Sequence, residues 1–174
     1  MRKSALAATL LTLSLAACSS DVGGNCPTMT GVTDASVRTV FRPGTAQDPA
    51  NVLYTAEITR VAGGCDIDKK TRVADARLAV DFRATRPASA GAVQYTIPYF
   101  VAVTEGARIL TRRTYAVTLS FQPGQTVATA TETIGSTRIN PSKDKFPYDY
   151  QILAGLQLSR AEVDYNRRTA HYQP

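Results

Sequence analysis

Apolar and polar residues alternate with a period of two through most of the chain from Val37 onward. The alternation is clearest over residues 73–84, where apolar side chains on one face alternate with four charged residues on the other. A half-buried strand with a charged solvent face has this pattern. Similar stripes occupy residues 52–58, 93–103, 115–121 and 150–158.

Turn signals separate the alternating segments. Glu105-Gly106 predicts a tight hairpin turn that leads into residues 107–110, and Pro123-Gly124 suits a type II turn. The only helix signal is a capping box, with Ser159 at the N-cap and Glu162 three residues later, which predicts a short helix that ends near Arg168.

Two segments have features of strands that lack a full set of neighbours. Residues 126–134 are rich in threonine and alternate weakly, as in an exposed edge strand. Pro98 has no N–H to donate, so we expect the strand over residues 93–103 to lie at an edge or to be bulged near its middle.

These segments predict an all-β fold. About seven strands with turns between them, and no helices between them, favour an antiparallel β-sandwich of the immunoglobulin-like or fibronectin III-like kind with a short C-terminal helix. A small closed β-barrel is the alternative. No repeat of fixed period is visible, so the sequence supports neither a solenoid nor a propeller.

The N-terminus has the organisation of an export signal. Met1-Arg2-Lys3 is basic, and residues 5–15 form an uncharged apolar run that is too short for the about 20 residues of a membrane span. The run ends in Leu15-Ala16-Ala17-Cys18, which closely resembles the bacterial lipobox. The resemblance implies cleavage before Cys18 and its modification by diacylglycerol and an acyl chain; a plain secretory peptide is the alternative.

This interpretation divides the chain into four parts: a signal peptide at 1–17, a lipidated cysteine and short linker at 18–25, a β-sandwich domain at 26–159, and a short helix and tail at 160–174. Several acyl chains on one residue give firm anchoring. Ser19 follows the cysteine, which by resemblance to the sorting rule of enteric bacteria favours the outer membrane. We therefore expect a lipid-anchored protein on the periplasmic face of a Gram-negative envelope membrane.

The chain has three cysteines, and lipidation of Cys18 leaves Cys26 and Cys65. Both lie in turn-like contexts, and the periplasm is oxidising, so the two are expected to form a disulfide. A redox pair is disfavoured because the chain has no Cys-x-x-Cys motif.

Composition argues against several kinds of chemistry. The 174 residues, with net charge +6 and a pI of about 9.4, contain a single histidine, His171, three residues from the end. Triads and metal sites built on histidine are therefore not expected, and neither a Gly-x-Ser-x-Gly elbow nor a phosphate loop is present. Asp66-Ile67-Asp68 has the start of a calcium loop but not its later ligands, which favours a plain turn. We expect no metal, no cofactor and no nucleic acid partner.

Basic residues offer a candidate interaction surface. Arg108, Arg112 and Arg113 cluster in one predicted hairpin. In a regular strand Arg112 and Arg113 face opposite sides of the sheet, so one of them must lie near a bulge or an end. A solvated face that aids solubility is the simpler interpretation of these charges.

Several short stretches resemble a family of uncharacterised Gram-negative lipoproteins. They are Cys26-Pro27, Gly63-Gly64-Cys65, residues 98–103, residues 150–158 and Tyr165-Asn166-Arg167-Arg168. The resemblance spans most of the chain after the signal peptide. It implies an envelope location and carries no known activity.

The leading hypothesis is a non-catalytic, membrane-anchored envelope lipoprotein that binds a protein partner or another envelope component near the membrane. We expect binding at a sheet edge or at the arginine hairpin. The first alternative is a carrier or chaperone for lipid or another apolar ligand, held in a cupped or barrel-like sheet. A cryptic envelope hydrolase is the weakest of the three hypotheses.

Overall fold

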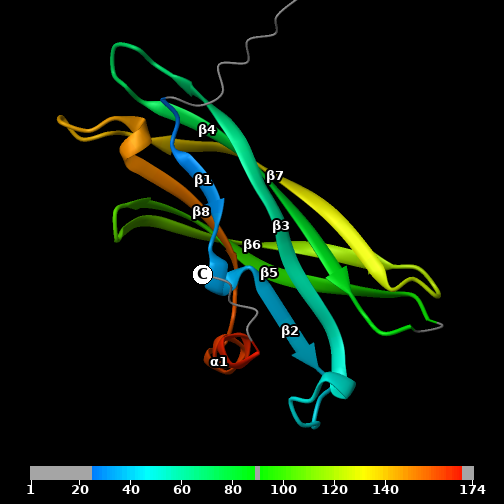
Figure 1. Cartoon of the computed structure of the whole chain (residues 1–174). Coiled ribbons are helices and arrows are strands. Elements are labelled where there is room, and N and C mark those ends of the chain that lie inside the picture. The colour runs from blue at the N-terminus through cyan, green and yellow to red at the C-terminus, as the bar shows by residue number, and fades with distance from the viewer. Residues whose placement is uncertain (1–24, 89–90, 170–174) are drawn as a thin grey trace, which may run out of the picture.

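The computed structural model describes residues 25–88 and 91–169, so the predicted signal peptide and Cys18 lie outside the described residues. Two four-stranded sheets pack face to face, in the strand orders β1-β8-β5-β6 and β2-β3-β4-β7 (Figure 1). The strands are β1 (Thr28–Gly31), β2 (Val37–Phe41), β3 (Val52–Ile67), β4 (Ala74–Thr85), β5 (Val93–Glu105), β6 (Arg108–Phe121), β7 (Val127–Ile139) and β8 (Tyr150–Leu156). One helix, α1 (Arg160–Arg168), follows. The predicted β-sandwich is confirmed, and the described strands form no closed barrel.

Strand pairing is antiparallel except where β1 runs parallel to β8, from Thr28 opposite Gln151 to Gly31 opposite Ala154. An immunoglobulin constant domain places its first, second, fifth and fourth strands in one sheet. The likeness to that fold is thus one of architecture and not of strand order. Sequence reasoning did not predict β1, because its four residues carry no alternating apolar stripe.

Inward-facing residues of both sheets fill the space between them. Every second residue of β4 is buried, as the alternation over residues 73–84 predicted. Phe82 of β4 meets Tyr99 of β5 across the core, with ring centroids 4.9 Å apart. The largest fully buried side chains are Tyr99, Phe82, Phe121, Leu78, Ile97, Leu119, Ile152, Leu156, Val80 and Val117.

Pro98 marks the point where β5 changes from an edge strand to an interior one. Residues 93–98 pair only with β6, whereas residues 99–105 lie between β6 and β8. The N–H of Gln157 donates to the carbonyl of Pro98 at 2.9 Å, just beyond the end of β8. In an antiparallel strand the N–H and C=O of one residue point to the same side. The N–H that proline lacks would therefore point past the end of β8, where no strand pairs with it. The predicted edge is confirmed for residues 93–98.

The hairpin between β5 and β6 turns at Gly106, whose φ of +57° lies in the left-handed region that glycine tolerates. The strand β6 then runs without interruption to Phe121. Its residues 108–114 are exposed on both faces, so the apolar alternation fades there while the ladder with β5 continues. All but the first residue of the segment 126–134 belong to β7, which is an edge strand as predicted.

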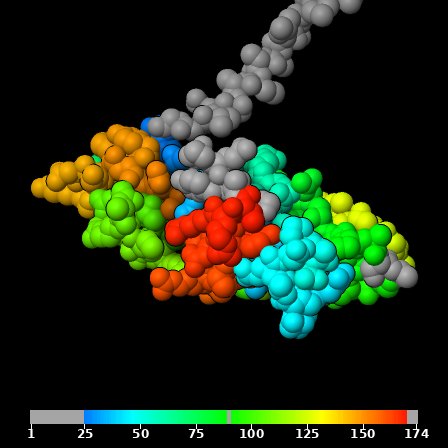
Figure 2. Space-filling view, turned by 60° about the horizontal axis from the view of Figure 1, so that its bottom comes forward, coloured from blue at the N-terminus to red at the C-terminus, as the bar shows by residue number. Residues whose placement is uncertain are grey.

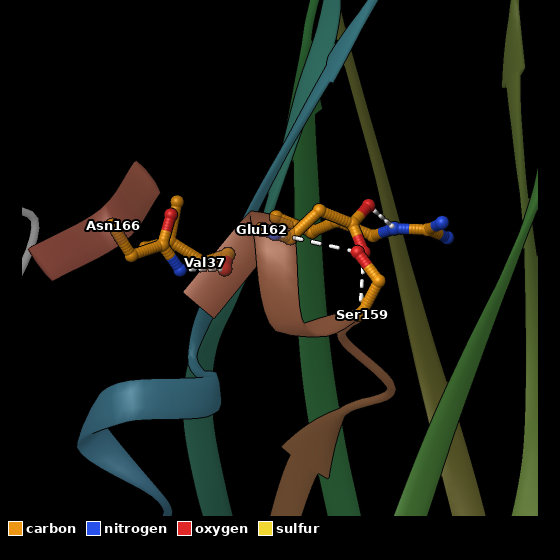
Figure 3. A network of polar contacts seen from close by, with 5 residues as sticks. Val37, Ser159, Glu162 and Asn166 are labelled. Atoms are coloured by element: carbon orange, nitrogen blue, oxygen red, sulfur yellow. Dashed lines mark hydrogen bonds and ion pairs between the residues drawn. The ribbon is translucent and has the colours of Figure 1, made fainter. Parts of the chain in front are cut away.

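The helix α1 packs on β2, which is the edge strand opposite β7 in the sheet β2-β3-β4-β7, and it lies beside the β2–β3 loop (Figure 2). The side chain of Arg168 donates to that of Gln47 in this loop at 3.0 Å. The predicted capping box is present, with the Ser159 hydroxyl and the Glu162 carboxylate each accepting the other residue's backbone N–H. The amide of Asn166 donates to the carbonyl of Val37 at 2.8 Å (Figure 3). The helix is therefore fastened to the edge it covers.

Glu162 joins the cap to the sheet. Its carboxylate accepts a hydrogen bond at 2.7 Å from Arg38 of β2, and both side chains are largely buried. Burial alone would raise the pKa of Glu162, but hydrogen bonds from the Ser159 backbone, Arg38 and the Ser159 hydroxyl together lower it. The charged form of Glu162 is thus bound more strongly in the folded protein than in the unfolded chain.

This linkage predicts a pH-dependent contribution of Glu162 to stability. Because folding lowers the pKa of Glu162, its charged form stabilises the folded protein at pH values above the ordinary pKa of 4.5. That stabilisation disappears as the pH falls through the folded-state pKa. We expect Glu162→Gln to cost about 1–2 kcal/mol at neutral pH and progressively less toward pH 3, as measured by urea unfolding. Asp164→Asn, at an exposed position of the same helix, is the control and should cost little at any pH. A constant cost of Glu162→Gln from pH 6 to pH 3 would contradict the assignment.

Candidate functional site

The three arginines of the predicted surface diverge in the structure. Arg108 forms an ion pair with Glu105 across the hairpin turn. The guanidinium of Arg112 lies 4.2 Å from the centre of the Phe100 ring, whereas Arg113 lines a groove at the opening between the two sheets. Arg112 and Arg113 therefore face opposite sides of β6, as the spacing predicted, and the three do not form one patch.

The two long edge strands, β6 and β7, come from different sheets and contact each other along one side of the sandwich. Among the described residues, no strand pairs with the outer side of β6 or of β7. The other two edges differ, because β1 has only four residues and β2 is covered by α1. The sandwich thus has one open side, formed by β6 and β7.

A groove of about 140 Å³ lies on this open side. Val101 and Val103 of β5 and Tyr115 of β6 contribute apolar surface to it. The polar lining comes from Thr111, Arg113, Ser136, Thr137 and Arg138. The groove therefore combines an apolar wall with hydroxyl and guanidinium donors.

Arg113 and Arg138 differ from most arginines of the domain. Ion pairs hold the guanidinium groups of Arg38, Arg60, Arg77, Arg83, Arg108 and Arg167. In the part of the chain that the structure describes, the guanidinium groups of Arg113 and Arg138 have no hydrogen-bond or ion-pair partner. The two residues border the groove from different faces, because Arg113 lies opposite core-facing Val101 and Arg138 lies opposite Asp75 on the outer face of its sheet. Guanidinium groups with free donors beside a groove favour a ligand that carries a carboxylate or another anion.

A β-bulge shapes the β7 side of the groove. Ile134 lies opposite Leu78 and Thr137 opposite Ala76, so Gly135 and Ser136 together face one residue of β4. Ser136 has a φ of +32°, in the left-handed region. A bulge of this kind redirects the side chains that follow it. Gly135 inside an alternating segment was the available sequence signal for it.

The open side also has an inward-pointing charge. Glu132 lies opposite Val80, whose side chain is in the core, so the carboxylate faces the interior near Tyr99. Burial raises the pKa of Tyr99 to about 12, and the charges of Glu132 and Tyr115 add to the effect. Inward-pointing charges discourage indiscriminate pairing at edge strands. A strand added to β7 must therefore complement Glu132.

The predicted disulfide between Cys26 and Cys65 is present, with Cα atoms 5.7 Å apart. Cys26 precedes β1 and Cys65 lies near the end of β3, so the bond joins the two sheets. Cys18 lies outside the described residues.

The neighbouring Asp66-Ile67-Asp68 segment forms a turn. The Asp68 carboxylate accepts N–H groups of Lys70 and Thr71 at 2.8 and 3.0 Å, hydrogen bonds that lower its pKa. Asp66 pairs with Arg77. In the described ranges no group of three or more His, Cys, Asp or Glu residues is placed to hold a metal ion.

Sequence reasoning missed Arg86, a buried arginine that follows β4. Its guanidinium donates to the carbonyls of Gln125, Gly91 and Gln122 at 2.9, 2.8 and 3.2 Å, and it stacks on Phe121 with 4.7 Å to the ring centre. It thereby ties the β4–β5 loop to the β6–β7 turn. No sequence signal marks this role, because its acceptors are backbone atoms up to 39 residues away.

No family model, curated protein or solved structure matches this chain. No helix within the described ranges has the length and apolar character needed to cross a membrane.

The disulfide generates a stability prediction. Closing a loop of this length should stabilise the fold by about 4 kcal/mol in the chain-entropy model. We expect the Cys26→Ala/Cys65→Ala protein to unfold at a clearly lower urea concentration than the oxidised wild type. Reduced wild-type protein is the matched control and should unfold near the double variant. Equal midpoints for the oxidised wild type and the double variant would show that the bond contributes nothing.

Proposed function

We propose that this protein is a non-catalytic lipoprotein of a Gram-negative envelope, anchored through lipid on Cys18, which binds a protein partner along its open β6–β7 side. The support for the anchor is the Leu15-Ala16-Ala17-Cys18 sequence after an uncharged apolar run. The support for the binding mode is the pair of unpartnered guanidinium groups, Arg113 and Arg138, at a groove between two free strand edges.

An extended segment of the partner fits this surface best. A free edge supplies backbone N–H and C=O groups to an added strand, and side-chain contacts beside it provide specificity. An acidic side chain of that segment would reach Arg113 or Arg138 beside the groove. The stretch 127–134 of β7 precedes the bulge and contains no lysine or proline; its inward-pointing charge is Glu132, which a paired strand would have to complement.

The groove is small for a free ligand. Its volume of about 140 Å³ is below the roughly 300–1,000 Å³ of typical small-molecule sites. Side chains such as Leu78, Ile97 and Leu119 occupy the space between the sheets. These observations favour a protein partner over the alternative of a lipid or apolar-ligand carrier.

The anchor is tested at Cys18. We expect metabolic fatty-acid labelling of the wild-type protein and its recovery with the membrane fraction. Cys18→Ser should remove both, because the thiol that receives diacylglycerol is gone. Cys26→Ala/Cys65→Ala, which leaves Cys18 intact, should keep full labelling. Labelling that survives Cys18→Ser would refute the lipid anchor.

The binding surface is tested by crosslinking in intact envelopes followed by capture of the lipoprotein. Arg113→Glu/Arg138→Glu should reduce recovery of the crosslinked partner at least tenfold, because an acidic segment would then meet like charge. Arg160→Glu reverses one arginine charge on α1, away from the groove, and should leave recovery intact. Two single variants of β7, Thr129→Pro and Ala130→Pro, supply a second comparison.

Adjacent N–H groups of an edge strand point in opposite directions, one toward β4 and one outward. The proline that removes the outward donor should weaken capture without loss of stability, whereas its neighbour should destabilise the sheet. Full recovery of the partner with every folded variant would place binding elsewhere. A co-purified apolar ligand in native mass spectra would then favour the carrier alternative.

A further inference from the structure

The lysines of the domain gather at one end of the sandwich. From residue 25 onward the chain has four lysines, Lys69, Lys70, Lys143 and Lys145. The first two lie in the β3–β4 turn, and the other two lie in the loop between β7 and β8. The ends of β3, β4 and β7 are in register there, with Ile67 opposite Ala74 and Ala74 opposite Ile139. We call this region, residues 67–73 and 140–149, the lysine end.

Direct contacts hold the two segments of the lysine end together. The guanidinium of Arg72 in the β3–β4 turn donates to the carbonyl of Lys143. The same group lies 5.0 Å from the centre of the Phe146 ring. Asp68 and Asp149 accept backbone N–H groups of their own segments, while no ion pair within the described residues involves a lysine. The lysine charges are therefore free to meet an external anionic surface.

Two aromatic rings stand exposed among these cations. Phe146 and Tyr148 are 43% and 48% exposed and stack in parallel, with ring centroids 5.2 Å apart. They border a hollow of about 170 Å³ together with Ile67 and Pro147. Aromatic rings next to lysine and arginine are typical of surfaces at the headgroup level of a bilayer.

The chain enters the domain at the same end. Asn25, the first described residue, lines the hollow beside Phe146 and Tyr148, and the start of β1 lies next to the β3–β4 hairpin (Figure 1). Cys18 is seven positions earlier, and an extended segment of that length spans at most about 25 Å. Val127, at the other end of β7, lies about 40 Å along the strand from Ile139. A lipid on Cys18 would therefore hold the lysine end, and not the opposite end, next to the bilayer.

We propose that the lysine end lies on an anionic bilayer surface, with Phe146 and Tyr148 inserted among the headgroups. The proposal rests on the lipid anchor proposed above and adds the orientation of the domain. The lysines meet anionic lipid phosphates, and the rings bury apolar surface at the interface. In this orientation β6 and β7 run away from the membrane, with the groove of Arg113 and Arg138 at their membrane-proximal end and residues 127–134 of β7 farther out, where they are accessible to a partner.

The absence of tryptophan from the chain permits a direct test. The full-length lipoprotein with Phe146→Trp is reconstituted in phosphatidylcholine vesicles, with and without phosphatidylglycerol, whose acyl chains carry bromine as a fluorescence quencher. Val127→Trp, at an exposed apolar position of the opposite end, is the matched control. We expect at least threefold stronger quenching for Phe146→Trp than for Val127→Trp, and an increase with phosphatidylglycerol.

A charge-reversed protein, Lys69→Glu/Lys70→Glu/Lys143→Glu/Lys145→Glu with Phe146→Trp, should lose the increase that phosphatidylglycerol produces. Tyr148→Trp serves as the probe if Phe146→Trp does not fold. Equal quenching of the probes at the two ends overturns the proposed orientation.

The intact mass of the same samples shows whether Cys18 is acylated, which separates failure of the anchor from failure of the orientation. For a protein without acyl chains, the full chain is added to preformed phosphatidylglycerol vesicles. Quenching of Phe146→Trp then supports the lysine end as a lipid-binding surface, and its absence overturns the proposal.

Discussion

Each of the two open sheets has two edge strands with unpaired backbone groups, and the molecule covers or shortens two of these four edges and leaves the other two free. One edge, β2, is covered by α1, which is held by Arg38–Glu162 and by the Asn166 amide on the Val37 carbonyl. A second edge, β1, is only four residues long and begins next to the disulfide. The edges β6 and β7 stay free on the same side. A sandwich that protects two edges and exposes two adjacent ones has a defined side for pairing.

Paired and unpaired cations also lie in different regions of the surface. Six of the described arginines are paired with carboxylates, so they contribute little net attraction to a partner. Within the described residues, unpaired cations gather at the β6–β7 groove and at the lysine end; Arg112, over the Phe100 ring, and Arg160 on α1 also have no ion-pair partner. The groove is bordered by two arginines, whose planar guanidinium groups suit a directed contact with an acidic side chain. The lysine end offers flexible point charges around two exposed rings, which suit a broad anionic surface.

Both ends of the sandwich are tied by contacts between segments distant in sequence. The Cys26–Cys65 disulfide joins the sheets at one end, and at the other Arg86 gathers the carbonyls of the β4–β5 loop and the β6–β7 turn. A buried guanidinium without a carboxylate is tolerated there because backbone carbonyls accept its hydrogen bonds and the Phe121 ring lies against it. The open β6–β7 side lies between these two tied ends.

The sequence by itself determined the local features: the alternation of β4, the turn at Gly106, the cap at Ser159 and the pairing of the two cysteines outside the lipobox. Each depends on residues within a few positions or on simple counting. Only the tertiary structure decided that β1 runs parallel to β8, that Arg112 and Arg113 part, and that Arg113 and Arg138 border the same groove. The physical reason is that the period of a strand specifies which face is buried but not which strand lies beside it. Strand order comes from the packing of the whole core, and the groove and the lysine end follow from that order.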